Sequence, residues 1–336
     1  MQMRQLGKLW PVSALTLGGG GLGQVWGETT RDEAIATVRF AVESGITLLD
    51  LAPLYGRGEA ESVVGEAFDG KWPDGVRVTT KNMLGSRHFK DVAGRLEASV
   101  VASLKTLKRE QADIFFLHSN IHPDDYSYTD DVAYHTYGAV PWSVYEGEIV
   151  PALEALKAKG LIGAWGITGT GLPRSIMEAL RGEPKPAVVQ AITNLLDSAG
   201  NMRRYEEPTE ARNIIRTAVN NDVGVMGIRA VQAGALTAAL DRPLKSTDPE
   251  AQDFARAAPF RALAKELGRD PAELAHGYAL AIDGVDTLVL GVKNRAELKM
   301  ALEAEALGPM DQEVYQRIEA LGLRRQAPRI PLDAPI

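Results

Sequence analysis

The sequence predicts an α/β protein in which eight strand and helix units follow one another around a parallel sheet. Short apolar segments alternate with amphipathic segments of helical period through most of the 336 residues, an order typical of repeated βα units. No Pro-rich or Gly/Ser-rich linker divides the chain, and a single α/β barrel can reach this length. We therefore expect one domain that spans residues 1–336.

Eight segments are candidate strands, and each is followed by a plausible helix. They cover residues 14–17, 47–50, 77–80, 113–117, 162–167, 187–190, 224–228 and 287–290. Eight such units favour a closed barrel, but an open doubly wound sheet shows the same alternation and differs in its strand order. The pattern of elements alone leaves both architectures open.

Several helix starts carry a side-chain acceptor followed by an acidic third position, which is the capping pattern of a helix N-terminus. These pairs are Thr30 with Glu33, Asp270 with Glu273, and Asn294 with Glu297. We expect helices to begin directly after Thr30, Asp270 and Asn294.

Composition excludes several classes of protein. The chain has no cysteine, so a disulfide framework, a thiolate nucleophile and a cysteine-based zinc site are excluded. A net charge of -7 argues against nucleic acid as a partner. The N-terminus lacks the apolar run of a signal peptide, and no apolar stretch reaches the length of about 20 residues that a membrane span needs. We expect a soluble, cytoplasmic protein.

The glycines Gly18, Gly20 and Gly23 match the pattern GxGxxG of dinucleotide-binding folds. That motif needs a helix that opens at the glycines, whereas residues 24–30 intervene here before helical periodicity begins. We therefore expect a flexible loop after the first strand and no Rossmann-type phosphate site.

Polar side chains stand at the ends of three consecutive predicted strands. Asp50 closes the second, Lys81 follows the third, and His118 follows the fourth. Carboxyl ends of parallel strands meet at one edge, so these groups are expected to lie within hydrogen-bonding reach, with Tyr55 folded over them. Each residue taken singly has a structural explanation, namely a cap, a rim charge, a buried histidine or loop packing.

Together these four side chains supply what carbonyl reduction requires. A phenol has a pKa of about 10 and becomes a better acid beside a cation. Lys81 is that cation for Tyr55. Asp50 holds Lys81 and offsets the cost of its burial, and His118 orients the carbonyl. Lys81 could alternatively serve a lyase as a Schiff-base amine, which requires a depressed lysine pKa.

The longest irregular stretch, residues 119–145, is expected to form a loop at the active site. It holds Tyr126, Tyr128, Tyr134, His135, Tyr137, Trp142 and Tyr145, although only 6% of the chain is aromatic. Packing of the loop on the barrel rim and direct contact with substrate both explain this concentration.

The segment GITLLDLAPLYGRGEAESVVGEAF, residues 45–68, resembles the aldo-keto reductase superfamily, as does the opening RQLGKLWPVSALTLG. The resemblance implies a (β/α)8 TIM barrel with an N-terminal β-hairpin and a long loop after strand 4. It also implies hydride transfer between a nicotinamide and an aldehyde or ketone, with Tyr55, Lys81, Asp50 and His118 as catalytic tetrad. Members prefer NADPH, although NADH is possible, and need no metal.

The resemblance also implies cofactor contacts. Thr168 and Gln190 match ligands of the nicotinamide carboxamide, and Arg229 is a plausible pyrophosphate contact. Gly291 leads into a helix start where Lys293 and Arg295 are candidates for the 2′-phosphate, unless they merely form a solvated first turn. Four positions depart from the family's usual contacts, namely Gly169, Ile228, Met300 and Ala301.

The expected substrate is a small carbonyl compound or a sugar. The aromatic residues of 119–145 favour a substrate with an apolar or ring-shaped portion, while oxidation of an aldose by NADP fits equally well. A function of another class is also open, namely a nicotinamide-binding sensor similar to the potassium-channel β-subunits that share this fold.

Overall fold

A computed structural model describes residues 1–128 and 132–324 of the chain. The strands of its central sheet are β3 (Leu15–Gly18), β4 (Leu48–Asp50), β5 (Arg77–Asn82), β6 (Ala112–Leu117), β9 (Ile162–Gly169), β10 (Val188–Ile192), β11 (Gly224–Ile228) and β12 (Thr287–Leu290). Within the described residues these eight strands are parallel and close into a barrel in the order β10-β11-β12-β3-β4-β5-β6-β9. The predicted (β/α)8 barrel is therefore confirmed, and the open sheet is excluded.

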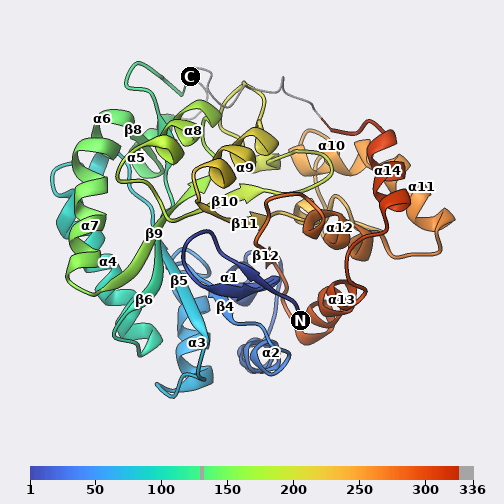
Figure 1. Cartoon of the computed structure of the whole chain (residues 1–336), viewed down its shortest axis with the longest axis horizontal. Helices are drawn as coiled ribbons and strands as arrows, with labels where there is room; N and C mark the ends of the chain where they lie inside the picture. Colours follow the sequence, from blue (N-terminus) through green and yellow to red (C-terminus); the bar gives the residue numbers. More distant parts are fainter. Residues whose placement is uncertain (129–131, 325–336) are drawn as a thin grey trace.

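Helices surround the barrel on its outside (Figure 1). The longer ones are α2 (Arg31–Glu43), α3 (Glu59–Phe68), α4 (Val92–Leu107), α7 (Val150–Ala158), α8 (Pro173–Arg181), α9 (Ala211–Asn220), α10 (Pro249–Arg256), α11 (Ala258–Glu266), α12 (Pro271–Leu280), α13 (Arg295–Ala306) and α14 (Gln312–Ala320). Short turns of helix are η1 (Ser86–His88), η2 (Tyr145–Ile149), η3 (Gly200–Met202) and η4 (Gln232–Gly234).

The predicted caps are present at the starts of α2, α12 and α13. Thr30, Asp270 and Asn294 each accept a hydrogen bond from the backbone N–H of the residue three positions ahead. Such caps satisfy amide groups that have no partner inside the helix.

An antiparallel pair of short strands, β1 (Met3–Gln5) and β2 (Pro11–Ser13), closes the N-terminal end of the barrel. Leu6 and Val12, on either side of its turn, are fully buried in one cluster with barrel residues such as Phe116. Gly7 has a φ of 50°, and a Cβ there would lie 2.4 Å from the backbone N of Gly224. This hairpin leaves only the C-terminal ends of the strands for a site.

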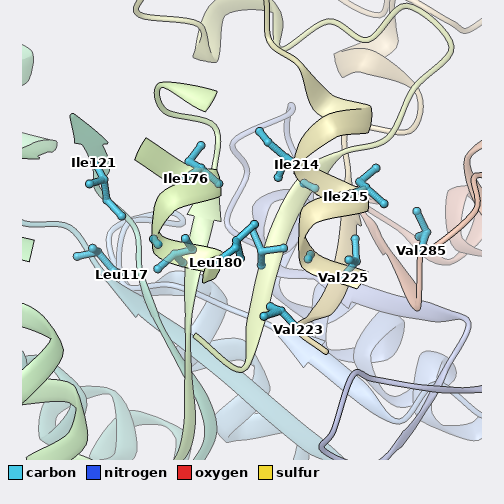
Figure 2. Packing of buried hydrophobic residues seen from close by; sticks show 14 of the residues in the cluster. Leu117, Ile121, Ile176, Leu180, Ile214, Ile215, Val223, Val225 and Val285 are labelled. Atoms are coloured by element: carbon cyan, nitrogen blue, oxygen red, sulfur yellow. The ribbon is translucent and has the colours of Figure 1, made fainter. Parts of the chain in front are cut away.

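The main core lies between the strands and the outer helices (Figure 2). Figure 2 shows Ile176 and Leu180 of α8 next to Ile214 and Ile215 of α9, over the barrel strands. Ile176 and Leu180 are four positions apart, and Ile214 and Ile215 are adjacent, so each pair lies on the face of its helix that turns toward the sheet. The barrel is thus held rigidly beneath its rim.

The region after β6 is more regular than predicted. Its ends form a parallel pair of strands, β7 (Asn120–His122) and β8 (Ala139–Pro141), and it contains α5 (Val132–Tyr137) and α6 (Trp142–Val144). Residues 129–131 of this predicted loop lie outside the described residues. The long connection after the fourth barrel strand is therefore present, but it is not irregular throughout, because backbone pairing between β7 and β8 orders both of its ends.

The aromatic side chains of this region pack mainly on one another. The ring of Tyr128 lies 4.7 Å from that of His135, 5.0 Å from that of Tyr126 and 5.5 Å from that of His122, all edge on. Tyr128 is buried. These contacts support the packing explanation for the aromatic residues.

The glycines after the first strand form a single helical turn, α1 (Gly19–Leu22). The prediction that no helix opens there was wrong in this detail, although the long helix α2 begins only at Arg31. Tight packing requires the glycines, since a Cβ on Gly21 would lie 1.9 Å from the carbonyl oxygen of Val292.

Along the described residues, no helix combines the length and the apolar character that crossing a membrane demands.

Candidate active site

Neighbouring strands bring the predicted polar residues to one end of the barrel. Asp50 is the last residue of β4 and pairs with Thr79 of β5, while His118 directly follows β6. Lys81 was expected after its strand but lies inside it, because β5 continues to Asn82 along β6. The C-terminal rim therefore carries all three groups.

A buried ion pair links two of them. The Nζ of Lys81 lies 2.8 Å from Oδ1 of Asp50, and the side chains are 0% and 3% exposed. The same Nζ donates to the backbone oxygen of Leu51 at 2.8 Å. Enclosure in protein strengthens this pair, but it also requires further hydrogen bonds to compensate the lost water.

Those hydrogen bonds to Asp50 come from Thr79, which the sequence analysis did not single out, and from Gln190, which it assigned to the nicotinamide. The Thr79 hydroxyl donates to Oδ1 at 2.6 Å, and the Gln190 side-chain amide donates to the same oxygen at 2.7 Å. Thr79 stands two positions before Lys81, and this strand spacing puts both on one face. That spacing was the available signal for Thr79.

Tyr55 lies over this pair from the turn between β4 and α3. Its ring centroid is 5.0 Å from the Nζ of Lys81 and 5.9 Å from the ring of His118, which it meets edge on. A Cβ on Gly23 would lie 2.5 Å from the carbonyl carbon of Tyr55. The glycine segment therefore packs directly against the tyrosine turn.

Burial raises the pKa of the Tyr55 phenol, while the positive charge of Lys81 acts to lower it. The net pKa lies above the ordinary value, so burial outweighs the lysine in the free protein. The effect of Lys81 has the predicted direction, but the prediction omitted the larger effect of burial. The phenol is thus protonated at neutral pH and able to donate.

Lys81 itself stays charged. Burial acts to lower its pKa, but the charge of Asp50 and the nearby Tyr55 outweigh burial and raise the pKa above its usual value. A Schiff-base lysine needs a depressed pKa. The electrostatic surroundings of Lys81 therefore oppose the lyase alternative.

His118 is a neutral imidazole. Burial, reinforced by the charge of Lys81, lowers its pKa to about 3. Its Nδ1 is buried and has no hydrogen-bond partner within residues 1–128 and 132–324. A neutral ring beside Tyr55 can donate or accept a hydrogen bond without carrying charge.

The two residues predicted to bind the nicotinamide carboxamide are already hydrogen-bonded inside the protein. The hydroxyl of Thr168, in β9, donates to the backbone oxygen of Leu117 at 3.2 Å. Gln190, its register partner in β10, uses its amide nitrogen on Asp50. Both are buried at the rim, and Gln190 connects this part of the rim to the Lys81 pair.

Arg229, the predicted pyrophosphate contact, has a different environment from the one expected. Its side chain is 6% exposed and its Nη2 lies 2.8 Å from Oε1 of Glu250, with Nε donating to Gln232. Burial lowers the pKa of the guanidinium, and Glu250 opposes that effect. Only Nη1 is without a hydrogen-bond partner in the described part of the chain, so a phosphate could meet just this nitrogen.

The predicted 2′-phosphate residues follow β12. Gly291 is exposed, and its missing Cβ faces the indole of Trp26 at 3.2 Å. Lys293 forms ion pairs with Asp241 at 2.9 Å and with Glu297 at 3.2 Å. Lys293, which the sequence analysis treated either as a phosphate ligand or as part of a solvated first turn, is therefore paired with two carboxylates.

Arg295, the first residue of α13, pairs with Glu33 at 2.8 Å. Of the positions that depart from the family's usual contacts, Met300 is exposed and Ala301 is buried in the core. Ile228 packs beside a small apolar cluster. The cations at the start of α13 are thus Lys293 and Arg295, each paired with a carboxylate.

These residues fit a nicotinamide dinucleotide at the barrel rim. The Nη1 of Arg229, which has no hydrogen-bond partner in the described part of the chain, is a donor of the kind that binds a phosphate group. The ring of His118 lies 5.9 Å from that of Tyr55, where a substrate oxygen needs a hydrogen bond. The donor set thus matches hydride chemistry on a carbonyl.

Comparison with known proteins agrees with this geometry. The model of the aldo/keto reductase family matches residues 14–322. The chain belongs to the aldo/keto reductase family. It is accordingly an oxidoreductase that interconverts carbonyl and alcohol groups with a nicotinamide cofactor.

Individual aldo/keto reductases resemble the chain over nearly its full length. L-galactose dehydrogenase of Arabidopsis thaliana is 28% identical over 329 residues, which cover 96% of this chain and 94% of that protein. The holo form of aldo-keto reductase AKR11C1 from Bacillus halodurans has a TM-score of 0.70 at 24% identity and covers 96% of both chains. Glycerol dehydrogenase AKR11B4 from Gluconobacter oxydans has a TM-score of 0.70 at 21% identity, with 99% and 98% covered. The two structures share this fold.

Proposed function

We propose that this aldo/keto reductase interconverts the carbonyl and hydroxyl groups of a small sugar or related carbonyl compound, with Tyr55 as the proton donor. The observation that carries this proposal is the buried Lys81–Asp50 pair at 2.8 Å beneath the ring of Tyr55. A cation fixed at that place stabilises the phenolate that remains once the tyrosine has given up its proton.

The roles of the four residues follow from their contacts. Tyr55 gives its hydroxyl proton to the substrate oxygen in reduction and takes it back in oxidation. Lys81 stabilises the phenolate, Asp50 keeps Lys81 charged and in place, and neutral His118 orients the substrate oxygen by a hydrogen bond. A bound nicotinamide supplies or accepts the hydride at the substrate carbon.

Sugar substrates are supported by the likeness to L-galactose dehydrogenase. The cofactor is a nicotinamide dinucleotide. The family resemblance favours NADPH, whereas Lys293 and Arg295 are both paired with carboxylates, which favours NADH.

Steady-state assays test this function directly. The purified chain is mixed with NADH or NADPH and a panel of aldehydes, and with NAD⁺ or NADP⁺ and a panel of aldoses that includes L-galactose. We expect saturable turnover of at least one compound, reduced by about 10²-fold or more in Tyr55→Phe. Saturable cofactor binding without turnover on any compound would instead establish the sensor alternative.

The lyase alternative has its own test. Borohydride added to a mixture of the protein and a carbonyl substrate traps a Schiff base as a stable adduct. We expect no adduct on Lys81, because its ion pair with Asp50 keeps it protonated. An adduct mapped to Lys81 by mass spectrometry would contradict its role as the cation beside Tyr55.

A further inference from the structure

The carboxylate of Glu33 already binds the donors that the sequence analysis assigned to a phosphate. Its Oε1 accepts hydrogen bonds from the backbone N of Arg295 at 3.0 Å and from Nε of the same residue at 3.1 Å. Its Oε2 accepts from Nη2 at 2.8 Å. A phosphate monoester binds this same combination of a guanidinium fork and a helix N-terminal amide. The chain thus presents its own anion at the start of α13.

Glu33 is held in this position by the first turn of α2. Its backbone N–H donates to the Thr30 hydroxyl at 3.2 Å, and its backbone oxygen accepts from the Thr37 hydroxyl at 2.7 Å. Figure 1 shows α2 beside α13 at the edge of the barrel. Hydrogen bonds from the Arg295 guanidinium and then from its backbone amide lower the pKa of the Glu33 carboxyl. The charge of Glu33 is therefore fixed at neutral pH.

The other cation of this region is neutralised as well. Lys293 is paired with Asp241 and with Glu297, and Glu297 also accepts a hydrogen bond from the backbone N of Lys293 at 2.9 Å. Asp241 also pairs with Arg242 at 2.9 Å, so three cations face the three carboxylates Glu33, Asp241 and Glu297. A dianionic phosphate must therefore compete with carboxylates that already bind these cations.

We propose that Glu33 selects a nicotinamide cofactor with a free ribose 2′-hydroxyl over its 2′-phosphorylated form, that is NAD(H) over NADP(H). This inference rests on the proposed function, because that function supplies the dinucleotide. A carboxylate accepts hydrogen bonds from ribose hydroxyls, whereas an unpaired arginine accommodates a 2′-phosphate. Glu33 both repels the phosphate and occupies the arginine that would bind it.

The exposure of the pair limits the size of the preference. The side chains of Glu33 and Arg295 are 28% and 55% exposed, so water screens their charges and the pair can open. We therefore expect a preference for NAD⁺ of about tenfold to hundredfold at low salt, the range of one or two charged hydrogen bonds. The preference falls as ionic strength rises.

Equilibrium binding to the full chain tests this inference without relying on turnover. Dissociation constants for NAD⁺ and NADP⁺ are measured by calorimetry at low and high salt for the wild type, Glu33→Gln and Asp32→Asn. Asp32 is the matched control because it loses the same charge in the same turn of α2, and no hydrogen bond or ion pair joins it to Arg295 within the described residues. Thermal melting checks that each variant is folded.

We expect Glu33→Gln to tighten NADP⁺ binding by about tenfold while NAD⁺ binding changes by less than about threefold. Asp32→Asn keeps the wild-type ratio, and adding Arg295→Ala to Glu33→Gln removes the gain. Wild-type binding of NADP⁺ as tight as that of NAD⁺, or an unchanged ratio in Glu33→Gln, overturns the role of Glu33 and leaves the proposed function intact. Binding of neither nucleotide overturns the proposed function itself, and this inference with it.

Discussion

The Nζ of Lys81 lies 2.8 Å from Oδ1 of Asp50, and neither side chain has appreciable access to water. That single carboxylate oxygen also accepts hydrogen bonds from Thr79 and Gln190. Three donors on one oxygen hold the carboxylate fixed in direction. The lysine charge is thereby kept beneath Tyr55, and four of the following experiments depend on this arrangement or on its surroundings.

Replacement of Tyr55 by Phe removes the hydroxyl and leaves the ring. We expect turnover to fall by about 10²-fold or more, because general acid catalysis contributes that much, while the dissociation constant of the cofactor stays near its wild-type value. Steady-state kinetics and calorimetry measure the two quantities. Tyr137→Phe, on an exposed tyrosine, is the matched control, and near-wild-type turnover of Tyr55→Phe would refute Tyr55 as the acid.

Replacement of Lys81 by Met leaves the buried Asp50 carboxylate without its cation. We expect the free energy of unfolding in urea to fall by about 3 kcal/mol, the lower end for broken buried pairs, because Thr79 and Gln190 still donate to Asp50. The double variant Asp50→Asn with Lys81→Met should recover much of this loss and remain inactive. Equal stability of the single and double variants would show that the pair is not coupled in this way.

The low pKa of His118, about 3, predicts acid destabilisation of a defined sign. An unfolded chain has the ordinary histidine pKa of about 6.5. Between that pH and pH 3, the unfolded chain binds a proton at His118 and the folded chain does not. Stability therefore falls as pH falls through this window, and His276, with a pKa of about 4 for the same reason of burial, adds to the effect.

Proton NMR of the imidazole groups checks this prediction. The His118 signal, identified by its loss in His118→Asn, should keep the chemical shift of a neutral ring from pH 8 down to pH 5. Urea denaturation of His118→Asn should show a shallower loss of stability on acidification than that of the wild type. A His118 signal that titrates near pH 6.5 would contradict the burial argument.

Replacement of Gly23 by Ala adds a Cβ that would lie 2.5 Å from the carbonyl carbon of Tyr55. Since real Cβ atoms do not approach backbone this closely, the turn that carries Tyr55 must shift. A displacement of about 1 Å in a catalytic group can cost about 10²-fold in rate, so we expect a loss of turnover larger than any loss of cofactor binding. Gly147→Ala is the control, because no atom lies within 4 Å of its added Cβ. Equal turnover in the two variants would contradict the close packing.

The local pattern of side chains was enough to predict the eight barrel strands and the caps of α2, α12 and α13. Strand alternation and capping depend on neighbours within a few residues, and those neighbours are visible in the sequence. The meeting of Asp50, Lys81 and His118 was also predictable, because the carboxyl ends of consecutive parallel strands must share one rim. The resemblance then distinguished the closed barrel from the open sheet, and the structure confirmed it.

Contacts between distant segments were decided only by the tertiary structure. Gln190 meets Asp50 across 140 positions of sequence, and Glu33 meets Arg295 across 262. Neither residue carries a local signal for its partner, so the sequence analysis assigned Gln190 and Arg295 to the cofactor and did not predict that each also binds a carboxylate. The raised pKa of Tyr55 was likewise decided only by the tertiary structure, because its main cause is burial, and burial depends on every segment that packs around the phenol.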